Sequence, residues 1–150
     1  MLIIRSINPQ TERELLEVAY LWRPGKPRKN RMPFDQFAAD YPNQVVMGLF
    51  NGDLIAVYFF HQIGETEYQA HFSADRKADR SAVLAGAKQL VEWFQQNGLQ
   101  MSAFVHKRNT ALRRFVESAG LMYQKDSSCH LTQKGANLTP NAETICEYRS

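Results

Sequence analysis

The chain has 150 residues, of which 44% are hydrophobic and 22% charged, and its formal net charge is +3. Its two cysteines show no paired spacing, and no apolar stretch approaches the ~20 residues that a membrane helix needs. Nothing in this composition favours a disulfide-stabilised, membrane or nucleic-acid-binding protein. We expect a single domain over residues 1–150, located in the cytoplasm.

The first elements follow from local signals. Residues 2–7 alternate as a half-buried strand does, and Asn8-Pro9 ends it. Thr11 and Glu14 form a capping-box pattern for a helix. The apolar residues expected on its inner face are Leu15, Val18, Ala19 and Trp22. The proline-rich and basic segment 23–33 predicts a loop, followed by a short helix over 34–41.

Three consecutive strands come next. Residues 45–50 and 54–61 flank Asn51-Gly52-Asp53, a combination typical of a β-hairpin. Because the second strand is almost continuously apolar, it should be covered on both faces and central in its sheet. A turn near Gly64 leads to a third strand, Glu67–Ala74. Short turns between the strands predict an antiparallel meander.

The second half of the chain predicts two helices between strands. A helix from Arg80 ends at Asn97-Gly98, and a helix capped by Asn109 ends at Gly120. The strand between them, over 99–105, should run parallel to the strand at 67–74 through a right-handed crossover. Two more strands are expected near 121–131 and 144–148. We expect the last strand to be an exposed edge that could pair across a homodimer.

Basic residues gather where the strand at 67–74 ends and the next helix begins. Arg76, Lys77 and Arg80 lie within this turn. The free N–H groups of a helix's first turn and the positive end of its dipole favour an anion such as phosphate. Arginine and lysine side chains would add charge-assisted hydrogen bonds. The turn therefore predicts an anion site.

The order of elements and one motif resemble the GNAT superfamily of N-acetyltransferases. The motif is Asn109-Thr110-Ala111 with Gly120-Leu121 eleven residues after the asparagine. The segment from Glu67 to Arg76, with Trp93-Phe94, is similar to a phage-type subset. The resemblance covers essentially the whole chain. It implies an α/β fold with a mixed, mostly antiparallel sheet of six to seven strands and about four helices, acetyl-CoA as cosubstrate, and no metal.

The resemblance also implies where the cosubstrate binds. The backbone of Phe72, Ser73 and Ala74 would pair with the pantetheine arm. The pyrophosphate would lie on the turn and helix start formed by Arg76, Lys77, Arg80, Ser81 and Ala82, and Asn109 would contact the coenzyme.

The sequence departs from the family pattern at three positions. Asp79 and Ser81 stand where the family's phosphate loop has glycines, and Val116 stands where many relatives have a tyrosine that protonates the leaving thiolate. Asp79 could cap the helix that begins at Arg80 and so occupy the N–H groups that phosphate would use. Asn109 could likewise cap the helix that follows it and not contact the coenzyme. Tyr68 and Tyr123 are available as replacement proton donors.

Acetyl transfer to an amine requires removal of a proton from that amine. Alternation places Glu67, Gln69, His71 and Ser73 on one face of their strand. Glu67 or His71 could accept the proton, and the resemblance favours Glu67. Alternatively, Glu67 is a solvated strand-end residue and His71 a hydrogen-bonded histidine of the sheet.

Two functions remain open at this point. The first is an acetyl-CoA-dependent N-acetyltransferase in which a primary amine of an unidentified acceptor attacks the thioester directly. The second is a catalytically inactive protein of the same fold that serves as a binding or virion-associated component. The retained Asn109 motif and the basic turn favour the enzyme, whereas the missing glycines and tyrosine favour the inactive protein.

Overall fold

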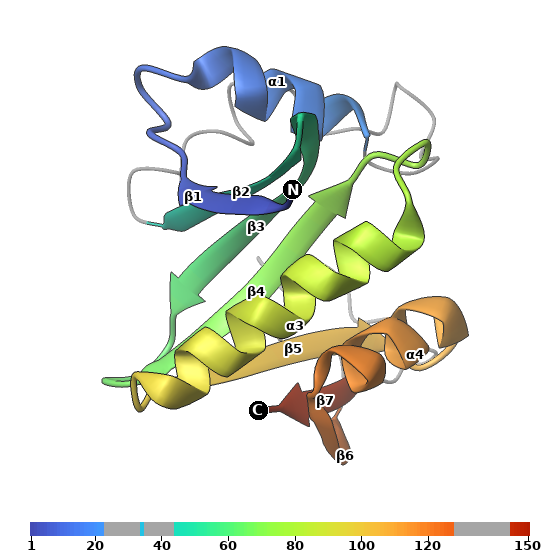
Figure 1. Ribbon diagram of the computed structural model, residues 1–150. Coiled ribbons are helices and arrows are strands. Elements are labelled where there is room, and N and C mark those ends of the chain that lie inside the picture. The colour runs from blue at the N-terminus through green and yellow to red at the C-terminus, as the bar shows by residue number, and fades with distance from the viewer. Residues whose placement is uncertain (23–33, 35–43, 128–144) are drawn as a thin grey trace.

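A computed structural model describes residues 1–22, 34, 44–127 and 145–150, and these form a mixed sheet with helices on both faces (Figure 1). The strand order is β1-β2-β3-β4-β5-β7-β6. In this part of the chain only β4 and β5 pair in parallel. The described elements are β1 (Ile3–Ser6), α1 (Arg13–Leu21), β2 (Val45–Asn51), β3 (Asp53–Gln62), β4 (Glu67–Ala74), α3 (Arg80–Gln96), β5 (Gln100–His106), α4 (Thr110–Ala119), β6 (Met122–Ser127) and β7 (Ile145–Arg149).

The predicted fold class is confirmed. Seven strands in this mostly antiparallel arrangement agree with the expected six to seven. Three helices are described, and the fourth predicted helix, over 34–41, lies outside the described residues apart from Phe34. No helix of the described part is both long and apolar enough to cross a membrane.

The antiparallel meander β2-β3-β4 forms as predicted. Gly52 has φ of 79° in the β2–β3 turn, a backbone conformation that glycine adopts without steric cost. The run from Ile55 to Phe60 in β3 is buried throughout. β3 lies between β2 and β4, and hydrophobic clusters on both faces of the sheet bury its side chains.

Helix α3 is the crossover between the parallel strands β4 and β5 and lies diagonally over one face of the sheet (Figure 1). Asp79 caps its first turn by accepting a hydrogen bond from the Ser81 N–H at 2.9 Å, and Gly98 follows its end with φ of 67°. At Gly86 the helix approaches β2 so closely that an added Cβ would lie 2.5 Å from Leu49 Cδ2. Gly86 therefore sets the distance between this helix and the sheet.

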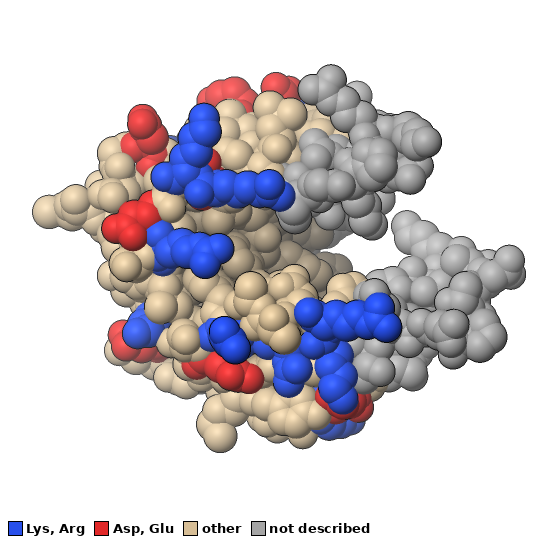
Figure 2. Space-filling view, turned by 90° about the vertical axis from the view of Figure 1, so that its right-hand side faces the viewer, with Lys and Arg blue, Asp and Glu red and all other residues tan. Residues whose placement is uncertain are grey.

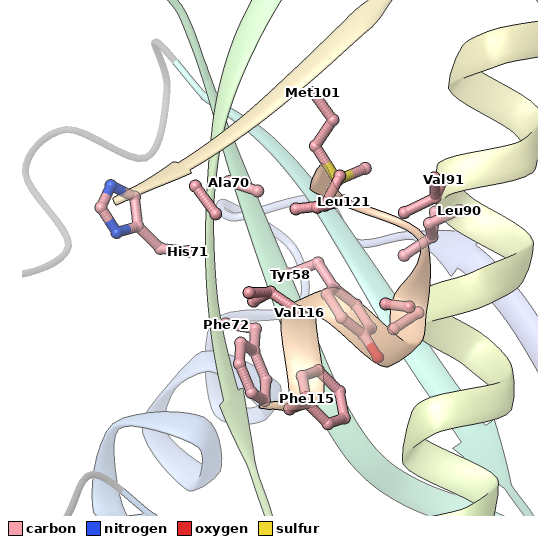
Figure 3. Close-up of a pocket in the computed structure, with 13 residues that line it drawn as sticks. Tyr58, Ala70, His71, Phe72, Leu90, Val91, Met101, Phe115, Val116 and Leu121 are labelled. Atoms are coloured by element: carbon pink, nitrogen blue, oxygen red, sulfur yellow. The ribbon is translucent and has the colours of Figure 1, made fainter. Parts of the chain in front are cut away.

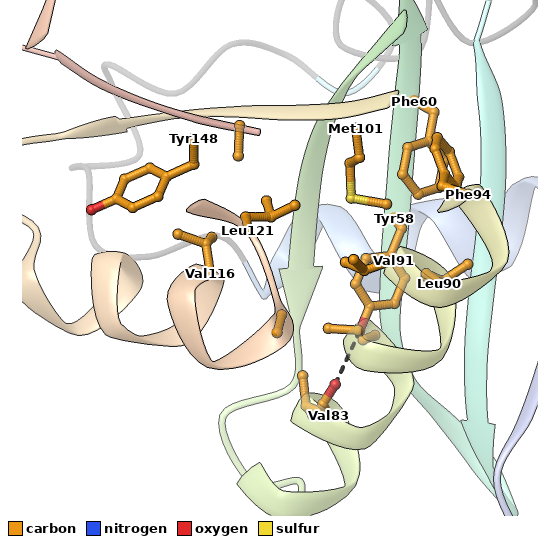
Figure 4. Close-up of a cluster of buried hydrophobic side chains, with 14 of the residues drawn as sticks. Tyr58, Phe60, Val83, Leu90, Val91, Phe94, Met101, Val116, Leu121 and Tyr148 are labelled. Carbon is orange, nitrogen blue, oxygen red and sulfur yellow. Dashed lines mark hydrogen bonds between the residues drawn. The ribbon is translucent and has the colours of Figure 1, made fainter. Parts of the chain in front are cut away.

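Two hydrophobic clusters join the layers. The larger one lies between the sheet and helices α3 and α4, and it includes Tyr58, whose hydroxyl donates to the Val83 carbonyl at 3.2 Å (Figure 4). The smaller one lies on the opposite face and joins α1 to β2 and β3 through Leu16, Ala19 and Phe59. The sheet is thus covered by α1 on one face and by α3 and α4 on the other.

The predicted start of α1 is wrong, whereas its inner face is confirmed for Leu15, Ala19 and Trp22, which pack in or against the smaller cluster. Glu12 occupies the N-cap position, and no side chain caps the helix there. Glu12 instead accepts hydrogen bonds from Arg5, at 2.8 and 3.1 Å, and from the Asn8 N–H. Leu16 is buried, whereas Val18 is 42% exposed. The helix thus begins one residue later than the capping-box pattern predicted, and Glu12 at its N-cap is paired with β1, a contact that local sequence spacing does not encode.

The predicted exposed edge at the last strand is also wrong. β7 pairs with β5 on one side and β6 on the other, and its residues from Ile145 to Tyr148 are buried. Among the described strands, β1 and β6 form the two edges. Chain order misled the prediction, because the terminal strand inserts between two earlier ones. A homodimer remains a prediction, but β7 cannot form its interface by strand pairing.

We predict that Gly86→Ala destabilises the protein by about 1–3 kcal/mol, because the new methyl group would overlap Leu49, which is fully buried. The gain in helix propensity, about 1 kcal/mol, is too small to offset this overlap. Urea denaturation measures the difference. Gly64→Ala, at an exposed turn without such a close contact, is the matched control. Equal or higher stability of Gly86→Ala would contradict the packing.

Candidate functional site

The parallel strands β4 and β5 part after a short paired segment. Their register contains Glu67 with Gln100, Tyr68 with Met101 and Gln69 with Ser102, and it ends there. β4 stays paired with β3 as far as Ala74, and β5 stays paired with β7 as far as His106. Beyond Gln69 and Ser102, no described strand pairs with the edge of β4 that faces β5. An extended group could pair with this edge as an added strand.

A cavity of about 50 Å³ lies beside this split, between the two strands and helices α3 and α4 (Figure 3). Phe72 of β4 stacks on Phe115 of α4, with ring centroids 4.9 Å apart, and on Tyr58 of β3 at 5.9 Å. The predicted site residue Phe72 thus closes one side of the cavity. Its lining residues are Tyr58, Ala70, His71, Phe72, Ala87, Leu90, Val91, Met101, Ala103, Phe115, Val116, Ala119 and Leu121.

No proton donor stands at Val116, which is buried and lines the cavity. Tyr58, which the sequence analysis did not single out, lines the same cavity. Burial raises the pKa of Tyr58 well above its ordinary value, and its hydroxyl already donates to Val83. It is therefore a poor acid. Tyr68 packs edge-on against Phe94, and Tyr123 donates to Asp126 at 2.6 Å, so neither lines this cavity.

The turn between β4 and α3 holds exposed Arg76, Lys77 and Arg80 at the end of the split. Two of its N–H groups already have anionic partners within the chain. The Lys77 N–H donates to Asp75 Oδ1 at 2.9 Å, and the Ser81 N–H donates to Asp79 Oδ1 at 2.9 Å. The Ala82 N–H donates to the Asp79 carbonyl at 3.1 Å. The alternative that Asp79 caps the helix is confirmed, so an anion here would depend on side chains.

Basic side chains lie on both sides of the hollow in the face that contains the strand ends (Figure 2). The turn after β5 contributes exposed Lys107 and Arg108. Lys107 donates to Asp126 Oδ2 at 2.9 Å, so its charge is paired. Asn109 accepts from the Leu112 N–H at 3.2 Å and caps α4. Its side-chain oxygen is therefore in structural use, as one of the two interpretations predicted.

The opposite face of β4 carries the predicted proton acceptors. His71 is exposed, and its ring points away from the cavity (Figure 3). Ser73 donates to the Ala19 carbonyl at 2.8 Å and ties β4 to α1. Glu67 accepts from the Ser102 hydroxyl at 2.6 Å and lies 3.7 Å from Arg149 Nε. Glu67 is thus a bonded carboxylate and not a solvated strand end.

Ser102 and Arg149 were missed by the sequence analysis. They lie 35 residues or more from Glu67 in the chain, and no motif marks either of them. Strand pairing brings them together, because Ser102 is opposite Gln69 of β4 on one side and Arg149 of β7 on the other.

A second cavity lies apart from the split between β4 and β5. A cavity of about 350 Å³ lies between α3 and the β1–β4 end of the sheet, and its lining residues carry no charge. No group of three or more potential metal ligands occurs among the described residues.

The comparisons with known proteins place this geometry in a known architecture. No family model matches the sequence, and no curated protein matches it either. A GNAT-family acetyltransferase from Streptococcus pneumoniae superposes with a TM-score of 0.67 over 100% of this chain and 98% of its own, at 14% identity. The chain has the GNAT fold. The resemblance to a phage-type subset stays a prediction.

Two other GNAT-like structures are similar over most of their length. The ribosomal-protein-S18-alanine N-acetyltransferase from Escherichia coli gives a TM-score of 0.72 over 99% of this chain and 92% of its own, at 16% identity. A putative acetyltransferase from Salmonella typhimurium, solved with its cofactor acetyl-CoA, gives 0.64 over 99% and 92%, at 13% identity.

We predict that Asp126, the partner of Lys107, makes stability fall at acid pH. Its pKa is lowered from 3.8 to about 2, first by the Tyr123 hydrogen bond and then by the Lys107 hydrogen bond. Because the folded-state pKa is depressed, this stabilisation is complete above about pH 4 and is lost as the pH falls towards 2. Urea denaturation between pH 4.5 and 2 should therefore give a shallower decline for Asp126→Asn than for the wild type.

Asp53→Asn is the control for this prediction, because the exposed Asp53 at the start of β3 has no such donors in the described structure. Parallel wild-type and Asp126→Asn curves would show that the Tyr123–Asp126–Lys107 contacts add no stability.

Proposed function

We propose that this protein is an acetyl-CoA-dependent N-acetyltransferase. The split between β4 and β5 carries the proposal, because no described strand pairs with the β5-facing side of Phe72, Ser73 and Ala74, where an extended pantetheine arm could pair. The GNAT fold supports it, and one structural neighbour was solved with acetyl-CoA. The backbone of Phe72, Ser73 and Ala74 would hold the arm so that the thioester reaches the base of the split.

The phosphates of the coenzyme would lie at the β4–α3 turn. Arg76, Lys77 and Arg80 are exposed there, and no acidic partner of theirs occurs among the described residues. Since Asp75 and Asp79 occupy backbone N–H groups, the side chains would supply most of the attraction. Ser81, Ala82 and Asn109 would also lie beside the coenzyme. The Ser81 and Ala82 N–H groups and the Asn109 side-chain oxygen would not bond to it, because they already make hydrogen bonds within the chain.

The reaction we propose is direct attack by a primary amine on the thioester carbonyl, with Glu67 or His71 accepting a proton. Both lie on the face of β4 opposite the apolar cavity, so the amine would approach from that side. One structural neighbour acetylates the alanine of a ribosomal protein, which suggests an N-terminal alanine peptide as a first acceptor to test.

A catalytically inactive binding or virion-associated protein is the alternative. Asp79 favours it, because its carboxylate takes a helix N–H that a phosphate would need and places a negative charge beside the phosphate. Val116 favours it as well, because it offers no proton to a leaving thiolate.

We predict that acetyl-CoA binds with a micromolar Kd, about −8 kcal/mol. Arg76→Glu and Arg80→Glu should each weaken binding at least about tenfold, because each replaces an attraction to phosphate by a repulsion. Isothermal titration calorimetry measures both. Lys88→Glu, an exposed charge reversal further along α3, is the matched control. Absence of heat and of a thermal shift at millimolar acetyl-CoA would exclude the enzyme and leave the binding protein.

We also predict that Asp79→Gly tightens acetyl-CoA binding about fivefold, equivalent to about 1 kcal/mol. The change frees the Ser81 N–H and removes a negative charge beside the phosphates. As an N-cap replacement, glycine should cost only a few tenths of a kcal/mol of stability. Asp79→Asn removes the charge but keeps a capping side chain, so its affinity for acetyl-CoA should lie between those of the wild type and Asp79→Gly. Weaker binding by Asp79→Gly would place the phosphates elsewhere.

A further inference from the structure

A chain of polar contacts crosses three strands on the face of the sheet that lies away from α3 and α4. Glu67 of β4 accepts from the Ser102 hydroxyl of β5, at 2.6 Å, and the same oxygen lies 3.7 Å from Arg149 Nε of β7. Arg149 also contacts Glu147 Oε1 through Nε at 2.9 Å and Nη2 at 2.8 Å. Ser102 is fully buried, and Glu147 is 4% exposed.

These contacts lie at the base of the split. Ser102 belongs to the last pair of residues that joins β4 to β5, and its side chain reaches back to Glu67, two residues before that point on β4. Its neighbours Met101 and Ala103 line the cavity on the other face. The Glu67 carboxylate is thus held where the strands part, on the side from which the proposed acceptor would approach.

Only one oxygen of Glu67 is engaged. Oε1 takes both contacts, whereas Oε2 has no hydrogen bond to any described residue. The Glu67 side chain is 23% exposed to solvent, so a small molecule or a water can reach it. This division leaves one oxygen fixed and the other available.

Stability alone gives no reason for this arrangement. Burying the Glu147 carboxylate carries a desolvation cost, and apolar residues of similar size often stabilise as well as a buried ion pair does. Glu147 does, however, hold the Arg149 guanidinium in one position by two contacts. Arg149 then places a positive charge beside Glu67, and Ser102 adds a hydrogen bond to the same oxygen.

We propose that Ser102 and Arg149 are positioning residues, with Arg149 anchored by Glu147, and that they hold Glu67 as the proton acceptor for the incoming amine. The proposal rests on the acetyltransferase function proposed above. Glu67 Oε2 takes a proton from the ammonium, and the neutral amine attacks the thioester carbon. The C–N bond forms, the C–S bond breaks, and the second nitrogen proton leaves with the thiolate as the free thiol. Glu67 then returns its proton to solvent.

Other charged or titratable groups face this carboxylate and are part of its environment. His71 lies on the same face of β4, and His61 of β3 is paired with Gln69 on that face. From β6, Lys125 Nζ lies 4.0 Å from Glu147 Oε2. Variants are therefore chosen at Ser102 and Arg149, which contact Glu67 itself.

The experiment compares Ser102→Ala and Arg149→Met with the conservative variants Ser102→Thr and Arg149→Lys. Calorimetry measures acetyl-CoA binding. Chromatography measures release of free coenzyme A between pH 5.5 and 9, with an N-terminal alanine peptide or spermidine as acceptor and with water alone. The measurement with water alone reports hydrolysis of acetyl-CoA, so it can be made although the natural acceptor is unidentified. Thermal melting verifies that each variant is folded, and Lys88→Met is the control for loss of an exposed charge.

We expect acetyl-CoA affinity to stay within about twofold of the wild type, because the four contacts lie on the acceptor face. The rate of coenzyme A release at neutral pH should fall at least about tenfold in Ser102→Ala and Arg149→Met. The acid limb of the pH profile should move to higher pH, since each variant removes a group that stabilises the carboxylate. Ser102→Thr and Arg149→Lys should restore part of the rate.

The outcomes separate the two proposals. If the wild type does not bind acetyl-CoA, the proposed function fails. If it binds acetyl-CoA but Ser102→Ala and Arg149→Met keep the wild-type rate and pH profile, the acetyltransferase proposal stands and the positioning proposal is overturned. Binding without any release of coenzyme A by the wild type, at any pH, would also overturn it, because Glu67 would then activate neither amine nor water.

Discussion

The short parallel pairing of β4 and β5 is the constraint on which the rest of the structure depends. Each strand keeps an antiparallel partner on its outer edge, β3 for β4 and β7 for β5, so the sheet stays intact in both halves while its centre opens. Along the opening, the described strands β4 and β5 no longer give each other's backbone N–H and C=O groups the ladder partners of a closed sheet. A group that can satisfy them, such as an extended amide-containing arm, would be bound without any particular side chain.

The two faces of this opening differ in chemistry. Towards α3 and α4 it is apolar, with the Tyr58–Phe72–Phe115 stack and a cavity of about 50 Å³. Towards α1 it carries Glu67, His71 and the contacts through Ser102 and Arg149. Strand alternation produces this difference, because neighbouring residues of β4 and β5 point to opposite faces. The apolar layer supports the strands, and the polar face carries the residues proposed above as proton acceptors.

The turn at the open end combines two opposing features. Its basic side chains attract an anion, whereas the Asp75 and Asp79 carboxylates occupy N–H groups that an anion would use. A loop with glycines would leave those groups free. In this protein, hydrogen bonds within the turn occupy those groups, so the proposed binding of phosphate would depend on long, exposed side chains and would weaken as the salt concentration rises.

Local signals in the sequence determined the elements that depend on neighbouring residues. Asn51-Gly52-Asp53 determined the β2–β3 hairpin, Asn97-Gly98 determined the end of α3, and Asn109 with Gly120 determined α4, because turns and caps are decided within a few residues. Tertiary structure alone decided that Glu12 pairs with Arg5 of β1 at the start of α1, that β7 inserts between β5 and β6, and that Ser102 and Arg149 meet Glu67. Those contacts join residues distant in the chain, and their partners are set by strand order and register, which no local pattern encodes.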